Sequence, residues 1–88
     1  MTYDRIIVRG DLTGPFQHIY VYKNGEKVDS IGVQFDDLPE TVLSYLQKYD
    51  LNCIELSGAI MFMQGIEKEI KKAVTTEYSG KDFTFRYV

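Results

Sequence analysis

Few side chains in this sequence could do chemistry, and they stand far apart. His18 is the one histidine, and no Asp or Cys stands at a spacing that would make it a metal ligand or a general base, so we expect a half-exposed neighbour within a strand. Cys53 is the one cysteine, and its place in a predicted strand favours a small buried hydrophobe over a nucleophile. Glu55 interrupts the same apolar segment, where an unpaired charge is costly, so we expect it to find solvent or a basic partner. The sequence therefore predicts no catalytic residue.

The composition predicts one small folded domain, residues 1–88, with an acidic balance. Hydrophobic residues make up 44% of the chain, including seven Tyr and five Phe, which is enough for a core and argues against disorder. The net charge is −3 because ten Lys and Arg are scattered among thirteen Asp and Glu. Even the densest basic patch, at Lys68, Lys71 and Lys72, is interleaved with Glu67 and Glu69. This scatter disfavours nucleic acid as a partner.

Two features of the sequence concern the compartment. A lone cysteine can form no intramolecular disulfide and no cysteine zinc cluster. The first residues lack the basic and apolar stretches of a signal peptide, and the longest apolar run, residues 59–63, is too short to cross a bilayer. We therefore expect a cytoplasmic protein with no membrane partner.

Hydrophobic patterning predicts three strands in the first part of the chain. A β-branched run at residues 5–9 predicts the first strand, and alternation over 16–23 and 28–35 predicts the second and third. Asn24-Gly25 between the last two is the strongest short-range hairpin signal, because both central residues of a type I′ turn need φ > 0. The apolar positions change parity beyond this turn, which predicts a bulge near residues 29–32.

The next part of the chain has apolar residues at helical spacing. Acidic residues and Pro39 predict a helix start near residue 36, and an apolar stripe continues the helix to Asp50. Residues 51–56 then form a predicted strand inside the sheet.

A second helix and a last strand complete the predicted order. Ser57-Gly58-Ala59 is predicted to open the helix and Ser79-Gly80 to end it, and residues 81–88 alternate as a strand. Strands separated by helical crossovers lie parallel to a neighbour. The prediction is therefore an α/β fold with the order β-β-β-α-β-α-β, a mixed five-stranded sheet and two crossover helices.

This order resembles the ribonuclease H-like fold, the unit that is duplicated in actin-like ATPases. The resemblance is sharpest over residues 54–74, where Ile54-Glu55-Leu56-Ser57-Gly58-Ala59 and a later Gly65-Ile66 look like the strand–turn–helix segment of that family. The chain also departs from the family. Ala59 replaces the second turn glycine, and this chain has one unit where the family binds a nucleotide between two. Asp11 is the one candidate for the acidic residue of the first strand.

The resemblance implies two kinds of site. Small residues at a turn before a helix let an anion approach the backbone, so a nucleotide-binding remnant would use Thr13, Ser57 and Gly58. A metal-dependent nuclease would use Asp11 and Glu55, because ribonuclease H-like nucleases hold metal with carboxylates from the first and fourth strands. A capping Ser and a tight Gly that bind nothing also account for the turn. No cofactor is expected.

Surplus apolar and aromatic residues suggest an interface. Tyr20 and Tyr22 share one strand face, and Met61 and Phe62 exceed what one buried helix stripe requires, which suits protein–protein contact. Our leading hypothesis is a non-catalytic protein-binding or assembly module whose partner is itself, as a dimer, or another protein. The nucleotide-binding remnant and the metal-dependent nuclease are the alternatives.

Overall fold

The computed structural model of the chain describes residues 4–58, 60, 64–77 and 82–87. The described elements are, in chain order, β1 (Arg5–Gly10), β2 (Phe16–Lys23), β3 (Glu26–Gln34), the 3-10 turn η1 (Phe35–Asp37), α1 (Leu38–Tyr49), β4 (Cys53–Gly58), α2 (Gln64–Glu77) and β5 (Thr84–Tyr87). The strands form one sheet in the order β3-β2-β1-β4-β5. β2 is antiparallel to both of its neighbours, β1 and β3, whereas β4 is parallel to both β1 and β5. The predicted α/β class, with a mixed five-stranded sheet and two helices, is confirmed.

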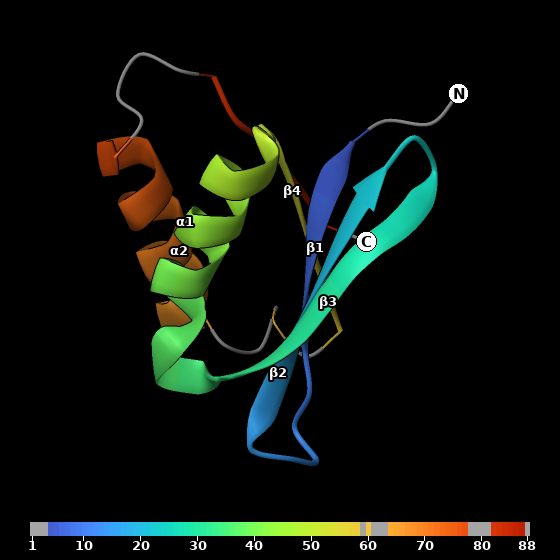
Figure 1. The fold of residues 1–88 in the computed structure, drawn as a ribbon. Helices are drawn as coiled ribbons and strands as arrows, with labels where there is room; N and C mark the ends of the chain where they lie inside the picture. Colours follow the sequence, from blue (N-terminus) through green and yellow to red (C-terminus); the bar gives the residue numbers. More distant parts are fainter. Residues whose placement is uncertain (1–3, 59, 61–63, 78–81, 88) are drawn as a thin grey trace.

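Both helices lie on one face of the sheet (Figure 1). The chain passes from β3, at one edge, to β4 and then from β4 to β5, so both helical connections step across the sheet in the same direction. Connections between parallel strands are nearly always right-handed, and two that step the same way pass over the same face. α1 and α2 therefore pack beside each other, and no described helix covers the opposite face.

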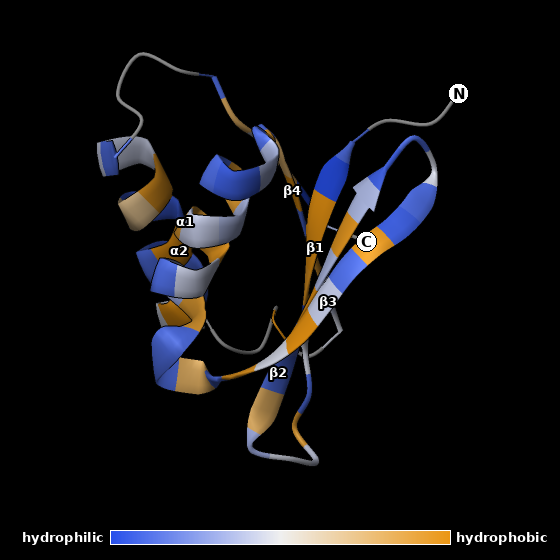
Figure 2. Ribbon diagram, viewed as in Figure 1, coloured by the Kyte–Doolittle hydropathy of each residue, from blue (hydrophilic) through white to orange (hydrophobic). Residues whose placement is uncertain are grey.

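The core fills the space between the sheet and the helices. In β1, Ile6 and Val8 are fully buried against the helices, while Ile7 between them faces the other way, as strand alternation requires. Burial of each such side chain stabilises the fold by about 1.5–3 kcal/mol. Figure 2 shows hydrophobic residues on the sheet and on the helices where the two layers meet. The other core members are Ile19, Val21, Val33, Leu38, Val42, Leu46, Leu51, Ile54, Leu56, Ile60, Ile66, Ile70 and Val74.

The β2–β3 hairpin has the predicted turn but a different bulge. Asn24 and Gly25 have φ values of 55° and 81°, as a type I′ turn requires. Tyr22 pairs with Lys27, but the next residue, Val21, pairs with Asp29. Val28 is therefore the extra residue, and the predicted bulge range of 29–32 is wrong by one position. The apolar alternation of β3 resumes only after the bulged residue, so the sequence pattern indicates positions that follow the bulge and not the bulge itself.

β4 runs further than the sequence predicted. Ser57 and Gly58 pair with Arg9 and Gly10 of β1, so the prediction that they open the second helix is wrong. Gly58 has a φ of 65°, and a Cβ there would lie 2.6 Å from the Gly10 carbonyl oxygen. Glycine is needed because the backbone turns left-handed while passing close to β1. A Ser-Gly pair suits such a strand exit as well as a helix cap, and α2 is described only from Gln64.

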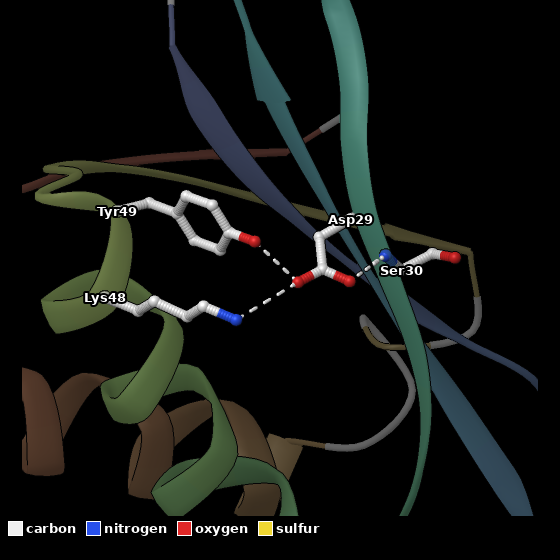
Figure 3. Close-up of polar contacts among 4 residues, drawn as sticks. All are labelled: Asp29, Ser30, Lys48 and Tyr49. Atoms are coloured by element: carbon white, nitrogen blue, oxygen red, sulfur yellow. Dashed lines mark hydrogen bonds and ion pairs between the residues drawn. The ribbon is translucent and has the colours of Figure 1, made fainter.

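Asp29, on the edge strand β3, contacts two residues of α1 (Figure 3). Its carboxylate accepts hydrogen bonds from the Tyr49 hydroxyl at 2.6 Å and from the Ser30 backbone N–H at 2.8 Å, and Lys48 Nζ lies 3.8 Å away. The Tyr49 hydrogen bond is the main reason that the pKa of Asp29 lies below its usual value. The same bond raises the pKa of Tyr49 to about 12. The contact therefore favours an ionised Asp29 beside a neutral Tyr49.

Several predictions fall on residues outside the described ranges. These are Ala59 of the turn, Met61 and Phe62 of the predicted interface, the Ser79-Gly80 helix end, and residues 81 and 88 of the last strand. Neither of the described helices has the length and apolar content needed to cross a membrane.

Candidate functional site

The face of the sheet opposite the helices, here called the open face, carries aromatic and basic side chains. It contains four basic residues and one acidic residue, in a chain whose net charge is −3. The fold therefore gathers on one surface positive charge that is scattered along the sequence. The open face consists of the residues that alternate with the core in the paired strands: Arg5, Ile7, Arg9, Phe16, His18, Tyr20, Tyr22, Lys27, Ser30, Gly32, Gln34, Cys53, Glu55, Ser57, Thr84 and Arg86.

A row of rings on β2 forms the centre of the open face. His18 and Tyr20 stack with their centroids 6.2 Å apart. Lys27 Nζ lies 5.3 Å from the Tyr20 centroid, and Arg5 Cζ lies 4.5 Å from the Tyr22 centroid, both within the range of cation–π attraction. The three rings are half-buried beside these cations, and the predicted half-exposed state of His18 is confirmed. The row offers π-faces and positive charge side by side.

Glu55 is buried and paired within the open face. It is 5% exposed, and its Oε1 accepts a hydrogen bond from Arg5 Nε at 2.9 Å across two adjacent strands. The predicted basic partner is therefore present. Cys53, two residues earlier, is buried as predicted. Burial, with a smaller contribution from the Glu55 carboxylate, raises the pKa of its thiol, which disfavours a reactive thiolate.

Two hollows meet on the open face near the carboxyl ends of β1 and β4. The larger, of about 530 Å³, is lined by the β1–β2 turn, Gly58, Arg9, His18 and Tyr20. The smaller, of about 340 Å³, also contains Arg9 and Tyr20 and extends toward Lys27. Because both share Arg9 and Tyr20, they join at these two side chains. From the end of β1 the chain continues to β2 on one side, and from the end of the neighbouring β4 it continues to β5 on the other side. Open α/β sheets bind ligands at such points, where the connections from adjacent strands go in opposite directions.

The β1–β2 turn at the larger hollow is held by its own polar groups. Asp11 Oδ1 accepts hydrogen bonds from the Thr13 hydroxyl at 2.6 Å and the Thr13 N–H at 2.8 Å. The buried Gln17 side chain accepts from the Asp11 N–H at 2.5 Å and donates to its carbonyl oxygen at 3.2 Å. The Thr13 hydroxyl is the main cause that lowers the pKa of Asp11. Asp11 is therefore a negative charge that lines the larger hollow.

The structure brings some of the predicted site residues together. Thr13 and Gly58 line the larger hollow with Asp11, and Ser57 lines the smaller one. Glu55 is not with them, because it pairs in register with a residue four positions before Asp11, a separation of about 13 Å along the strand. Among the described residues, no three His, Cys, Asp or Glu side chains gather where a metal ion could bind.

The basic residues of the open face were not singled out from the sequence. Arg5 and Arg9 lie on β1, Lys27 on β3 and Arg86 on β5. The signal was present in the alternation of β1, where both arginines fall on the positions that do not face the core. The alternation of β1 indicates a basic surface only once the strand order is known, because that order places β1 at the centre of the sheet.

The free edge of β3 is a second exposed feature. β3 is nine residues long and pairs with β2 alone among the described strands. Its end before the bulge carries charges, but residues 30–34 carry none. Ile31 is 39% exposed and Phe35, directly after the strand, is 40% exposed. Figure 2 shows hydrophobic residues recurring along this strand.

Comparison with protein-family models, with curated proteins and with solved structures finds no match to this chain. The function must therefore be inferred from the residues and their geometry.

Proposed function

We propose that this chain is a non-catalytic assembly module that self-associates by pairing β3 with β3 of a second copy. The observation that carries the proposal is the uncharged edge at residues 30–34, with Ile31 and Phe35 exposed beside it. Unpaired N–H and C=O groups of an edge strand pair readily with a strand of another chain unless charges, proline or a bulge prevent it. In β3 the bulge at Val28 and the charges lie in the other half of the strand.

Edge pairing agrees with the charge of the open face. A two-fold axis through the β3 edge, perpendicular to the sheet, joins two five-stranded sheets into one and leaves both open faces on the same side. An interface in which two copies meet through Tyr20 and Tyr22 would instead bring Arg9 and Lys27 of one copy against the same cations of the other. Like charges across an interface oppose association.

Light scattering coupled to size exclusion tests the proposal. We expect twice the chain mass of 10.2 kDa at high micromolar concentration, and a shift to the single-chain mass for Ile31→Lys, which puts a charge on the edge. Leu12→Lys is the matched control, because Leu12 is 70% exposed and lies in the β1–β2 turn, outside β3. A wild-type protein that stays at the single-chain mass contradicts the proposal, and so does an Ile31→Lys variant that remains dimeric.

We also propose that the sheet has the ribonuclease H-like topology. The element order supports this assignment, and so does the parallel pairing of β1 and β4, which brings the turn after the first strand beside the end of the fourth. The same register argues against a metal-dependent nuclease, since it separates the backbone positions of Asp11 and Glu55 by about 13 Å along the strand, whereas the two metals of such a site lie about 4 Å apart. The lone buried Cys53 fits a reducing, cytoplasmic location.

A nucleotide site at the larger hollow is the second candidate function. The observation in its favour is that Thr13 and Gly58, from separate segments, line one hollow with Arg9. A thermal-shift measurement with ATP and Mg²⁺ tests it, because a ligand that binds only the native state raises the melting temperature. A rise that Thr13→Val abolishes supports the site. No rise at millimolar ATP removes it.

A further inference from the structure

We propose that the open face binds single-stranded nucleic acid, with bases stacking on Tyr20 and Tyr22 and phosphates contacting Arg9 and Lys27. The proposal concerns the face of one copy and does not depend on self-association. It revises the expectation drawn from the scattered charges of the sequence.

Charge complementarity identifies an anionic partner. The strands present four basic residues and one carboxylate on the open face, although the whole chain has a net charge of −3. Glu55 is already paired with Arg5. Arg9 and Lys27 are exposed, and neither forms an ion pair with an acidic side chain in the described part of the chain. These two cations are therefore placed to receive an external anion.

The ring row identifies a partner with aromatic groups of its own. His18, Tyr20 and Tyr22 occupy alternate positions of one strand, about 7 Å apart along the backbone, and the rings of His18 and Tyr20 lie 6.2 Å apart. Bases of a single strand stack on such rings whatever the sequence, because every base has a π-face. A duplex keeps its bases stacked inside, and no described helix projects from the open face to enter a groove.

The free protein already uses these rings to hold cations. Lys27 lies over Tyr20 at 5.3 Å, so a base that stacks there would displace the ammonium toward the phosphates beside it. Arg9 and Tyr20 border both hollows, of about 530 and 340 Å³, which are within the size range of small-ligand sites. Asp11 also lines the larger hollow, within electrostatic range of Arg9 and His18, so a phosphate is expected in the smaller hollow, which Arg9 and Lys27 line.

An acidic peptide is the competing partner, and the rings argue against it. Carboxylates would satisfy Arg9 and Lys27, but they offer nothing to stack on Tyr20 and Tyr22. An experiment that tests stacking on the rings therefore distinguishes single-stranded nucleic acid from an acidic peptide, whereas an experiment that tests charge alone does not.

Fluorescence anisotropy with a labelled oligothymidine of about twelve nucleotides, within the site sizes of single-strand binding folds, tests the proposal. We expect binding whose affinity falls with salt. Two phosphate contacts give a slope of log K against log salt of about −1.4, and Arg9→Gln lowers its magnitude by about 0.7. Lys72→Gln on the exposed face of α2 removes the same charge elsewhere and leaves the slope unchanged.

The ring is tested by two substitutions at one position. Tyr20→Leu is expected to weaken binding about fivefold or more, because base–aromatic stacking is lost, whereas Tyr20→Phe retains the ring and binds within about twofold of the wild type. If Tyr20→Leu does not fold, the affinity of Tyr20→Phe and the salt dependence of Arg9→Gln still test the proposal. A poly-glutamate of equal charge, or a duplex of equal length, that binds as tightly as the oligothymidine overturns the proposal. Absence of binding to oligothymidine at about millimolar protein also overturns it.

Running the same titration on the Ile31→Lys variant separates the two proposals. If this variant is monomeric and binds oligothymidine, the open face acts in one copy. If this variant is monomeric but no longer binds oligothymidine, the open face of one copy is not sufficient for binding. The nucleic-acid proposal then fails, while the self-association proposal stands.

Discussion

The two faces of this sheet are built from alternate residues of the same strands, yet they differ in almost every property. On β1 and β4 the covered face is aliphatic and buried under the helices, through Ile6, Val8, Ile54 and Leu56. The open face has rings, arginines and an ion pair that is part-buried, and its members are mostly half-buried or exposed. The direction of the two helical crossovers decides which face is which. The covered face therefore accounts for folding, and the open face is where binding is to be sought.

Neighbouring isoleucines in β1 test this difference most strongly. Ile6→Ala removes a fully buried side chain from the covered face, and we expect the free energy of unfolding to fall by about 2–5 kcal/mol. Ile7→Ala makes the same change on the half-buried open face, and we expect a loss of about 1 kcal/mol. Urea denaturation of both variants at one protein concentration measures the contrast. Equal losses would mean that the open face is packed as tightly as the core.

The end of β4 provides the next largest effect. Gly58→Ala places a Cβ 2.6 Å from the Gly10 carbonyl oxygen at a φ of 65°, and we expect a loss of about 1–3 kcal/mol. Gly14→Ala is the control, because a Cβ at Gly14 meets nothing within 4 Å, and its effect should stay within about 0.5 kcal/mol. Thermal or urea unfolding gives both values. A neutral Gly58→Ala would show that the strand exit relaxes freely.

The features predicted correctly from the sequence are those that neighbouring residues determine. Asn24-Gly25 specifies its own turn, and Asp50 ends α1 with a left-handed φ of 53°. The alternation of Ile6 and Val8 marks the core face of β1 without further information. Each of these signals is complete within a few residues.

The features that were missed depend on contacts between distant segments. Arg5 and Glu55 are fifty positions apart, and only the pairing of β1 with β4 joins them. The role of Ser57 as a strand residue likewise comes from its pairing with Arg9. Thr13 and Gly58 were named from a resemblance, and their shared hollow arises because Gly10 and Gly58 are partners in the sheet. Strand order, which local patterns do not encode, assembled the candidate site.

The ion pair of the open face can be compared with one on the covered side. Arg5→Gln leaves the Glu55 carboxylate, whose side chain is 6% exposed, without its 2.9 Å partner, and we expect a loss of about 1–3 kcal/mol. Lys48→Gln removes an exposed cation 3.8 Å from Asp29, where a loss of about 0.5 kcal/mol or less is expected. Urea denaturation near neutral pH distinguishes them. A larger loss for Lys48→Gln would reverse the order that burial predicts.

The Asp29–Tyr49 contact gives an effect that depends on pH in two directions. The folded pKa of Asp29 lies below its usual 3.8, so its contribution is complete above about pH 4 and is lost as the pH falls through the lowered value. Tyr49 has a folded pKa of about 12 against a usual value of 10. Its contribution is therefore complete below pH 10 and is lost as the pH rises toward 12.

Substitution of either partner should flatten both limbs of the stability curve. Tyr49→Phe removes the shared hydrogen bond, so the fall in melting temperature between about pH 10 and 12 should become smaller, and the acid limb below about pH 4 should shrink with it. Asp29→Asn should do the same from the other side. Tyr22→Phe, which alters a hydroxyl on the open face, serves as the control. If only one limb changes in Tyr49→Phe, then the two groups do not titrate through one contact, and Asp29 is held on β3 by Ser30 and Lys48 instead.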